Sequence, residues 1–452
     1  MSSTKATTKA TTKATTTTSK ATTSKLLNQG VYGCVYYPSF TCRGNISKSK
    51  STVAKLELKD SNSVNEVEIG NIIKKIRHYD RHFAPIVRSC DIKLNLLTDK
   101  PQNKSTLDEC NVVKNSDFQQ NDFKLIYIKH INGMDIDKYM NGIDVPTLFV
   151  STFFSGYFYC LKGLDLMGGA GVIHFDLHAG NIYYDLDNKR PMIIDFGLSI
   201  DTSRFYKGSG SSEIDYYKMK RAFLGYKPKH YNYTPESHFL SFLLEKYHGD
   251  DRDLDVELTK QDLMTFLNDI IIYNKILPSF NQITRQIMRS SYVSVGNIGE
   301  KYKLQLIKYY ERFVGKDYRS IIGQLAPAYC MMIDDYMLNI NFIKFIIDKF
   351  VQLSERTDKD KATSPLTYEK ILYSLLQIFV LQLHPVPEKR LTREEISLLF
   401  KTIVLGDESS AILDILREKA RDFMDIEIGL SLLSHPTAKE FLKSIEKDIT
   451  YG

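Results

Sequence analysis

The pattern of apolar and polar positions predicts that the first third of the chain is rich in β-strands. Apolar residues alternate with polar ones over 26–37, which predicts a hairpin whose tip carries glycines, and 51–58 is typical of a strand. Residues 84–97 indicate a strand pair and 123–131 a further apolar strand. Between them, 98–122 is polar and is expected to be a surface loop.

One helix interrupts these predicted strands, and a helical pattern takes over after them. Over 65–77 the isoleucines recur at helical spacing, and 144–168 predicts a long aromatic helix. Residues 240–365 are helical in pattern, 368–383 is an apolar helix, and 406–452 is expected to add one or two helices. We therefore expect an α+β protein.

Composition suits a globular protein with two domains and a polar tail. The chain has 452 residues and a formal net charge of +6. Residues 1–25 repeat Lys-Ala-Thr-Thr with variations, a composition that predicts a disordered tail, and removing the five lysines of this tail leaves about +1. The body therefore lacks the strong positive field that nucleic-acid binding requires.

The cysteines and the apolar segments bear on compartment and membrane. The six cysteines include no Cys-x-x-Cys pair, so we expect reduced residues of a cytosolic or nuclear protein. The N-terminus has no apolar segment that would act as a signal peptide. The most apolar stretch, 149–173, is interrupted by Lys162 and Asp165, so a core helix is expected and membrane insertion is not.

Candidate chemistry is concentrated in 171–198. Two short apolar runs each end in a loop, and the loops carry His174, Asp176 and Asn181, then Asp195. An Asp and an Asn five residues apart, with a further Asp beyond a hairpin, can converge on one point. Carboxylate and amide oxygens are ligands that Mg²⁺ prefers, and another Asp nearby could accept a proton from an attacking hydroxyl.

This stretch resembles the catalytic loop and the Asp-Phe-Gly metal loop of the protein kinase superfamily. Other segments resemble the family in the same order along the chain, over about 26–400. The hairpin resembles its glycine-rich loop, although Asn28 stands at the first glycine position. By this resemblance the nucleotide would be bound by Leu27, Asn28, Gly30, Gly33 and Val35, and by the backbone from Ile128 to His130.

Two further pairs follow from the same resemblance. Lys55 lies in the Val-Ala-Lys of the strand 51–58 and would hold the α- and β-phosphates. It would be oriented by a helix carboxylate, for which Glu66 is preferred and Glu68 is the alternative. Thr234-Pro235-Glu236 resembles the motif that closes the activation segment, and in the family its Glu pairs with a late Arg. Here the pair would be Glu236 and Arg390.

The resemblance implies a two-lobe kinase fold and ATP-dependent phosphorylation of Ser/Thr hydroxyls on proteins. The N-lobe, 26–131, would be a small antiparallel sheet with one key helix. The C-lobe, 132–405, would be mostly helical, with a divergent region at 240–365 and an apolar helix at 368–383 that lacks the Asp expected of the central helix. Asp176, Lys55 and Glu66 would be catalytic, and Asn181 and Asp195 would bind Mg²⁺.

Two departures from the family leave other functions open. Phe175 replaces the Arg that receives an activation-loop phosphate in the family, which makes that mode of activation less expected. His178 replaces a Lys and resembles small-molecule kinases of the aminoglycoside or choline type, which is one alternative. An inert pseudokinase scaffold is another. The divergent C-lobe resembles kinase-like proteins of large DNA viruses, so we expect a monomer in the host cytoplasm or nucleus, or in a virion, acting on protein substrates that the sequence does not identify.

Overall fold

The computed structural model describes residues 23–30, 33–115, 122–208, 210–223, 225–230, 232–271, 276–287, 298–355, 366–405 and 411–449. The predicted disordered tail lies outside the described residues, except for residues 23–25. The chain divides into two compact units. The first unit holds the residues up to 59 together with 87–130, and the second holds 60–86 together with 131 onward.

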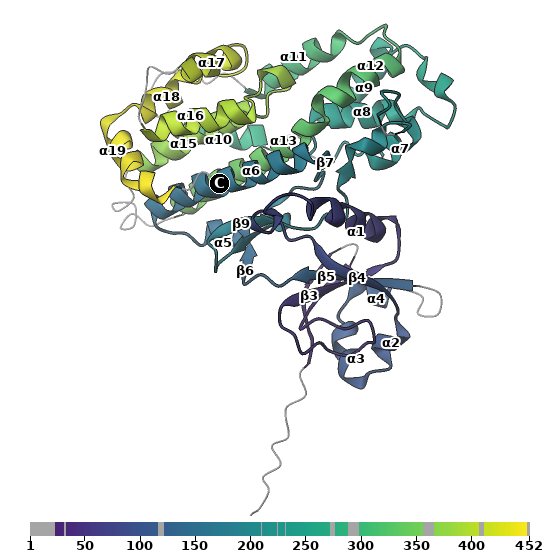
Figure 1. Cartoon of the computed structure of the whole chain (residues 1–452). Helices are drawn as coiled ribbons and strands as arrows, with labels where there is room; N and C mark the ends of the chain where they lie inside the picture. The colour runs from purple at the N-terminus through teal and green to yellow at the C-terminus, as the bar shows by residue number, and fades with distance from the viewer. Residues whose placement is uncertain are drawn as a thin grey trace, which may run out of the picture. The chain divides into compact units, whose positions relative to one another are not determined.

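The first unit is built on a five-stranded sheet with the strand order β1-β2-β3-β5-β4 (Figure 1). β1 (Lys25–Gln29) and β2 (Gly33–Tyr37) form the predicted hairpin. β3 (Thr52–Leu58) pairs antiparallel with both β2 and β5 (Asp122–Lys129), as alternating apolar residues on these strands predict. The expected strand pair at 84–97 is wrong, because the only strand in that range is β4 (Ile86–Lys93).

The polar insertion is helical and not a surface loop. It contains α3 (Pro101–Leu107) and α4 (Asn111–Lys114), and α2 (Asn95–Thr98) ends at its first residue, while 116–121 lie outside the described residues. Sparse apolar side chains, Leu97, Leu107 and Val113, are buried in the same core as the sheet residues Leu56 and Leu125. Burying these few side chains stabilises three short helices that would not persist alone.

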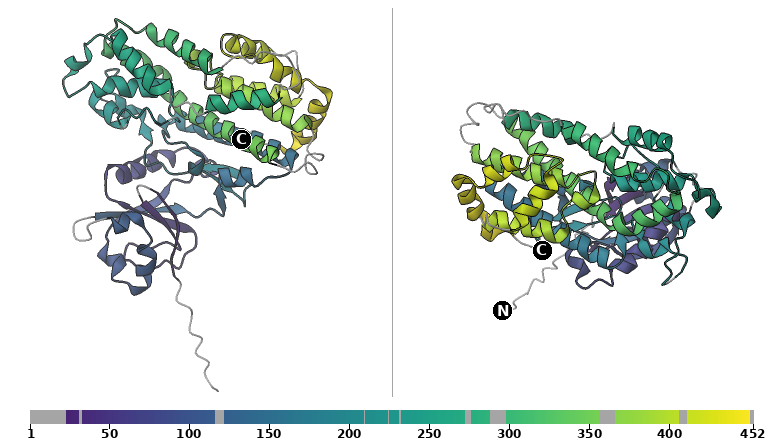
Figure 2. Two further views of the ribbon diagram at one scale, coloured as in Figure 1. Left: turned by 180° about the vertical axis from the view of Figure 1, so that it is seen from behind. Right: turned by 90° about the horizontal axis from the view of Figure 1, so that it is seen from above.

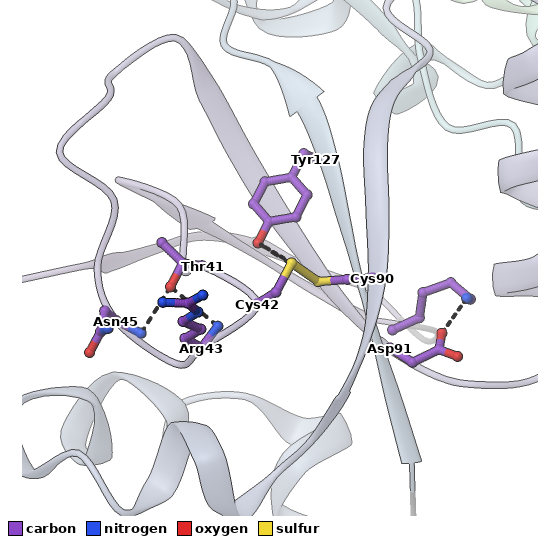
Figure 3. The surroundings of a disulfide bond; sticks show 8 residues. Thr41, Cys42, Arg43, Asn45, Cys90, Asp91 and Tyr127 are labelled. Carbon is purple, nitrogen blue, oxygen red and sulfur yellow. Dashed lines mark hydrogen bonds and ion pairs between the residues drawn. A yellow bond between two sulfur atoms is a disulfide. The ribbon is translucent and has the colours of Figure 1, made fainter.

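Two disulfides in the first unit overturn the expectation that all the cysteines are reduced. Cys34 is bonded to Cys110, which joins β2 to the insertion, and Cys42 is bonded to Cys90 on β4 (Figure 3). The hydroxyl of Tyr127 lies 3.5 Å from the sulfur of Cys42. The partners are 76 and 48 residues apart in sequence, and only the pairing of the strands brings them together. Among the described residues, the two remaining cysteines are buried and unbonded.

The second unit begins with the helix predicted by the isoleucine spacing, α1 (Ser61–Ile73). The Asp60 carboxylate caps it by accepting hydrogen bonds from the amides of Asn62 and Ser63, each at 2.9 Å. The helix ends earlier than expected, and its buried face includes Glu66 and Ile69. Although the sequence analysis groups this helix with the sheet, it belongs to the second compact unit.

Three long helices form the core of the second unit: α6 (Pro146–Gly169), α13 (Ile333–Ser354) and α15 (Leu366–Leu381) (Figure 1). α13 packs against both of the others. Their aromatic rings meet edge to face. The ring centroid of Phe153 on α6 lies 5.0 Å from that of Phe342 and 5.2 Å from that of Phe379. Helices are thus present at both predicted positions, 144–168 and 368–383. None of the helices in the described residues is both long and apolar enough to span a membrane.

Shorter helices surround this core. The predicted helical character of 240–365 is confirmed in its described parts, and the described part of the C-terminal region, 411–449, has three α-helices where one or two were expected. Figure 2 shows the yellow C-terminal helices gathered at one end of the helical unit. In chain order the helices are α5 (Ile136–Asn141), α7 (Tyr216–Ala222), α8 (Pro235–Glu245), α9 (Lys260–Ile271), α10 (Ile276–Ile287), α11 (Ile298–Glu311), α12 (Tyr318–Tyr329), α16 (Arg393–Leu405), α17 (Ala411–Ala420), α18 (Glu427–Leu433) and α19 (Pro436–Ile445).

Two small sheets of the second unit hold the loops that carry the candidate chemistry. β6 (Gly133–Asp135), β8 (Ile182–Asp185) and β9 (Arg190–Ile193) form one sheet, and β7 (Val172–Ile173) pairs with β10 (Ile200–Asp201) in the other. The loop 174–181 therefore runs from β7 to β8, and the loop 194–199 runs from β9 to β10. The antiparallel pairs β7–β10 and β8–β9 bring the two loops together.

Candidate active site

A buried carboxylate fixes the backbone at the start of the loop 174–181. Asp334 accepts hydrogen bonds from the amide of His174 at 2.6 Å and from the amide of Phe175 at 2.9 Å. Phe175 has a φ of 63°, a left-handed conformation that is unfavourable for a bulky side chain. The two bonds to Asp334 thus offset strain in the residue directly before Asp176.

Sequence reasoning missed Asp334, which lies at the N-terminal end of α13. The apolar helix expected at 368–383 has no Asp, and the carboxylate that contacts this loop belongs to α13, which begins at Ile333. Asp334 is 4% exposed, and burial raises its pKa while the two backbone hydrogen bonds and the nearby His174 oppose the rise. The available signal was the pair Asp334-Asp335 at the start of a strongly apolar helix, since a buried carboxylate needs partners.

Asp176 and Asn181 face each other across the same loop, as their spacing predicts. The side-chain nitrogen of Asn181 donates to the backbone oxygen of Asp176 at 2.8 Å and to its carboxylate at 3.3 Å. Burial is the main cause that raises the pKa of Asp176, and the charge of Asp195 raises it further. A carboxylate with a raised pKa is a better proton acceptor, so this environment suits a general base.

His174 and His178 flank Asp176 in different ways. His174 is fully buried, and a nitrogen of its ring lies 3.0 Å from the backbone oxygen of Ile194, which joins the two loops. His178 is at the surface, where its Nδ1 accepts a hydrogen bond from Gly180 and its Nε2 lies 3.9 Å from the Asp176 carboxylate. His174 is therefore structural, and His178 is the histidine that an acceptor substrate could touch.

The second loop brings Asp195 beside Glu66 of α1. Asp195 also has a φ of 63°, and a Cβ built on Gly197 would lie 3.5 Å from Oδ1 of Asp195 and 3.6 Å from Oε2 of Glu66. Two carboxylates therefore border the same glycine.

The two candidate carboxylates of α1 have different surroundings. Glu66 is buried at 1% exposure on the face directed at the 195–199 loop. Glu68 is exposed and pairs with Arg204 at 2.6 Å. Because Glu66 is buried beside the 195–199 loop whereas Glu68 is exposed, Glu66 is the better candidate for a functional carboxylate.

Lys55 lies in the first unit, in the centre of the five-stranded sheet. Its ammonium is 2.7 Å from the carboxylate of Glu57, two residues along β3 and on the same face of the strand. Both side chains are largely buried, at 10% and 5% exposure. Sequence reasoning overlooked Glu57, although residues i and i+2 of a strand share a face. The predicted pairing of Lys55 with Glu66 remains a prediction.

The glycine-rich hairpin is also in the first unit. The amide of Gly30 donates to the carbonyl of Gly33 at 2.9 Å and closes the turn. A Cβ at Gly33 would lie 2.7 Å from the carbonyl oxygen of Leu56, so only glycine fits there, whereas Gly30 faces open space. Asn28 lies opposite Val35 in the hairpin register, and Leu27 is exposed. An exposed apolar residue beside unfilled space suits a ligand-contacting loop.

The predicted adenine-binding backbone lies at the end of β5. Ile128 is opposite Val53 in the sheet, and the amide of His130 donates to the carbonyl of Ser51 at 2.9 Å. The ring of His130 stacks on Tyr37 with 4.2 Å between centroids. An adenine contact at His130 would therefore use its carbonyl, or would require the bond to Ser51 to open.

The predicted pair of Glu236 and Arg390 is confirmed. Two hydrogen bonds join the guanidinium to the carboxylate, at 2.9 and 3.2 Å, and both side chains are almost fully buried. A bidentate geometry of this kind compensates for the cost of burying two charges. The pair connects the start of α8 to the turn before α16, 154 residues later.

A cavity of about 230 Å³ opens beside the loop 174–181. His178 and Gly180 of this loop line it together with Asn232 and Asn341. Its charged lining residues are Asp135, Asp137, Lys138 and Lys344. A polar acceptor of modest size would fit such a mixed lining.

The donor set of the loop suits Mg²⁺. The side-chain nitrogen of Asn181 faces Asp176, and its oxygen makes no hydrogen bond within the part of the chain that the structure describes. That amide oxygen and the carboxylate of Asp195 are hard ligands of the kind that Mg²⁺ prefers, in company with phosphates. No group of three or more His, Cys, Asp or Glu side chains that could hold a metal occurs in the described residues, so any ion here would also depend on ligand phosphates.

The structure thus brings Glu66, Asp176, Asn181 and Asp195 together in the second unit, with the remaining predicted residues in the first unit. Comparison with models of known protein families finds no match to this chain, and a search of curated proteins finds no matching relative.

Proposed function

We propose that this protein is an ATP-dependent phosphotransferase with a two-lobe protein-kinase fold, and that it phosphorylates Ser or Thr hydroxyls of proteins. The observation that carries the proposal is the loop 174–181. Asp176 and Asn181 are hydrogen-bonded across it as their five-residue spacing predicts, and burial, with a smaller contribution from the charge of Asp195, raises the pKa of Asp176. The loop backbone is held in a strained conformation, which is typical of functional sites.

Each residue has a role in the proposed transfer. Asp176 accepts the proton of the acceptor hydroxyl while the hydroxyl oxygen bonds to the γ-phosphorus. The bond between the γ-phosphorus and the bridging oxygen of the β-phosphate breaks, and ADP leaves. Asn181 and Asp195 would hold Mg²⁺, which when bound neutralises charge on the phosphates. By the kinase resemblance, Lys55 would contact the α- and β-phosphates, and Glu66 would supply the carboxylate that orients it.

The confirmed pair of Glu236 and Arg390 also supports the proposal. The two residues lie far apart in sequence, and only the kinase resemblance links them before the structure is known. Chance agreement is improbable for a buried bidentate pair, because an unpaired buried charge is strongly destabilising. The pair therefore supports the proposed kinase fold at a position remote from the candidate chemistry.

A small-molecule kinase is the second candidate, and the cavity beside His178 favours it. At about 230 Å³, lined by both carboxylates and lysines, the cavity could hold a polar metabolite as readily as one side chain of a protein. The same Asp176 would then accept a proton from the hydroxyl of the metabolite.

One labelling experiment tests the proposal and separates the two candidates. The full chain is incubated with radiolabelled ATP, Mg²⁺, a generic basic protein, and a panel of aminoglycosides and choline. We expect label on Ser and Thr of the protein and none on the small molecules. Asp176→Asn and Asp195→Asn should lower the transfer rate by about a thousandfold or more while the circular dichroism spectrum is unchanged.

Asp144→Asn is the matched control, because Asp144 is an exposed carboxylate of the same unit outside the site. It should retain full activity. Label on a metabolite alone would identify a small-molecule kinase. Absence of transfer from any preparation that binds ATP would support the inert scaffold and refute the enzyme. Full activity in Asp195→Asn would refute its assignment as a metal ligand.

A further inference from the structure

Asn65, the neighbour of Glu66 on α1, forms hydrogen bonds with every polar group of its side chain to the segment 197–204, which begins within the Asp195 loop. Its nitrogen donates to the carbonyl of Gly197 at 3.1 Å and to that of Ser199 at 2.8 Å. Its oxygen accepts a hydrogen bond from Arg204 at 3.0 Å. One amide thus ties the helix to three residues of the segment 197–204.

Arg204 links the same segment to the helix a second time. Its guanidinium pairs with Glu68, which lies one turn from Asn65 on the same face of α1. Arg204 and Glu68 are 41% and 53% exposed, so water screens their pair and its own contribution is small. Asn65 is half-buried and bonds to backbone, so most of the connection depends on Asn65.

The segment is anchored in turn to the loop that carries Asp176. Thr202 donates to the carbonyl of Gly171 from both its amide and its hydroxyl, each at 2.9 Å. The hydroxyl of Ser199 donates to the carbonyl of His174 at 3.2 Å. A continuous series of hydrogen bonds therefore runs from α1, through 197–204, to the loop 174–181.

Apolar packing orders the chain further along. Phe175 stacks on Tyr233 with centroids 4.8 Å apart, and meets Phe223 edge to face at 5.5 Å. A phosphate would need cationic partners. Phe175, which contacts the segment at Phe223 and Tyr233, is instead an uncharged aromatic residue. The arrangement already places Glu66 and Asp195 against Gly197 without any modification.

We infer that Asn65 is a positioning residue, which holds Glu66 and the Asp195 loop in their active arrangement without phosphorylation of the segment 200–233. The inference rests on the proposed phosphotransferase function. It predicts that the protein as first synthesised is already active. It also predicts that loss of the Asn65 side chain lowers kcat more than loss of the ion pair between Glu68 and Arg204.

The test compares Asn65→Ala, Glu68→Ala and the control Arg221→Ala, whose guanidinium lies on α7 outside these contacts. Asn65→Ala should lower kcat about tenfold or more with the KM for the acceptor unchanged, because three hydrogen bonds are lost but no substrate contact. Glu68→Ala should change kcat less than about threefold, and Arg221→Ala should not change it. Asn65→Gln, which keeps the amide, should recover part of the loss.

Two further measurements decide between the possible outcomes. Wild-type protein treated with a phosphatase should keep its activity, and loss of activity would overturn the inference. Hydrogen exchange read by mass spectrometry needs no activity, and Asn65→Ala should speed exchange in 61–73 and 195–205. Unchanged exchange and unchanged kcat would also overturn it. If the wild-type protein has no phosphotransferase activity but Asn65→Ala still speeds hydrogen exchange, the proposed function is refuted while the contact made by Asn65 is established.

Discussion

Replacing Asp334 with Asn should loosen the loop that carries Asp176 without unfolding the protein. The carboxylate accepts two backbone hydrogen bonds, and an Asn side chain can accept only one while its NH₂ group faces the other amide. A hydrogen bond to a charged group contributes about 1.5–3 kcal/mol, and a buried donor left unsatisfied costs about 1–3 kcal/mol. The neutral amide avoids the burial cost that raises the pKa of Asp334. We therefore expect a net loss of about 2 kcal/mol for Asp334→Asn.

Asp334→Ala should be worse, because both amides lose their acceptor and a buried space opens. Two unsatisfied donors give about 4 kcal/mol, a large part of the stability of a typical protein. Urea unfolding measures both variants against Asp144→Asn. Hydrogen exchange of the peptide that covers 171–178 should quicken in Asp334→Asn, and kcat should fall at least about tenfold because Asp176 is displaced. Unfolding and exchange equal to those of Asp144→Asn would refute the assigned role of Asp334.

Two more predictions concern cysteines and pH. Four cysteines are in disulfides, so thiol titration of the unfolded chain should find two reactive thiols before reduction and six after it. Six reactive thiols before reduction would refute both disulfides. Burial lowers the pKa of His238 to about 4 and that of His384 to about 3, so the unfolded chain binds protons that the folded chain does not as pH falls below 6.5. The free energy of unfolding should thus drop by about 2 kcal/mol per histidine from pH 7 to 5, and urea midpoints that do not change with pH, or that change equally in a His238→Gln, His384→Gln double variant, would contradict this.

Local patterns predicted what local forces determine. The hairpin and the strands at 51–58 and 123–131 follow from alternation of apolar side chains, and α1 follows from isoleucines at helical spacing. The pair of Glu236 and Arg390 was predictable because both residues lie in segments that resemble kinase motifs, in the same order along the chain. The convergence of Asp176 and Asn181 was predictable because the two residues are only five positions apart in one short loop.

Contacts between distant segments were beyond the same reasoning. Nothing near Asp334 in the sequence indicates that its partners are the amides of His174 and Phe175. The polar composition of 98–122 concealed α3 and α4, because only a few of its apolar residues reach the core. The disulfides depend on strand pairing, which spacing along the chain cannot reveal. The choice between Glu66 and Glu68 depended on knowing that Glu66 is buried and that Arg204 pairs with Glu68 at the surface. Arg204 lies on a distant segment, so the helical pattern of α1 could not indicate this contact.

The division of the chain at Lys59, Ile86 and His130 limits how the protein could be cut into pieces. A fragment that ends at His130 would contain every strand of the large sheet, but it would also carry α1 without the segments that cover it. Glu66 and its apolar neighbours would then meet water, and such a fragment should aggregate or recruit chaperones. On the ribosome the same situation arises briefly, because α1 emerges long before the residues that bury it are made.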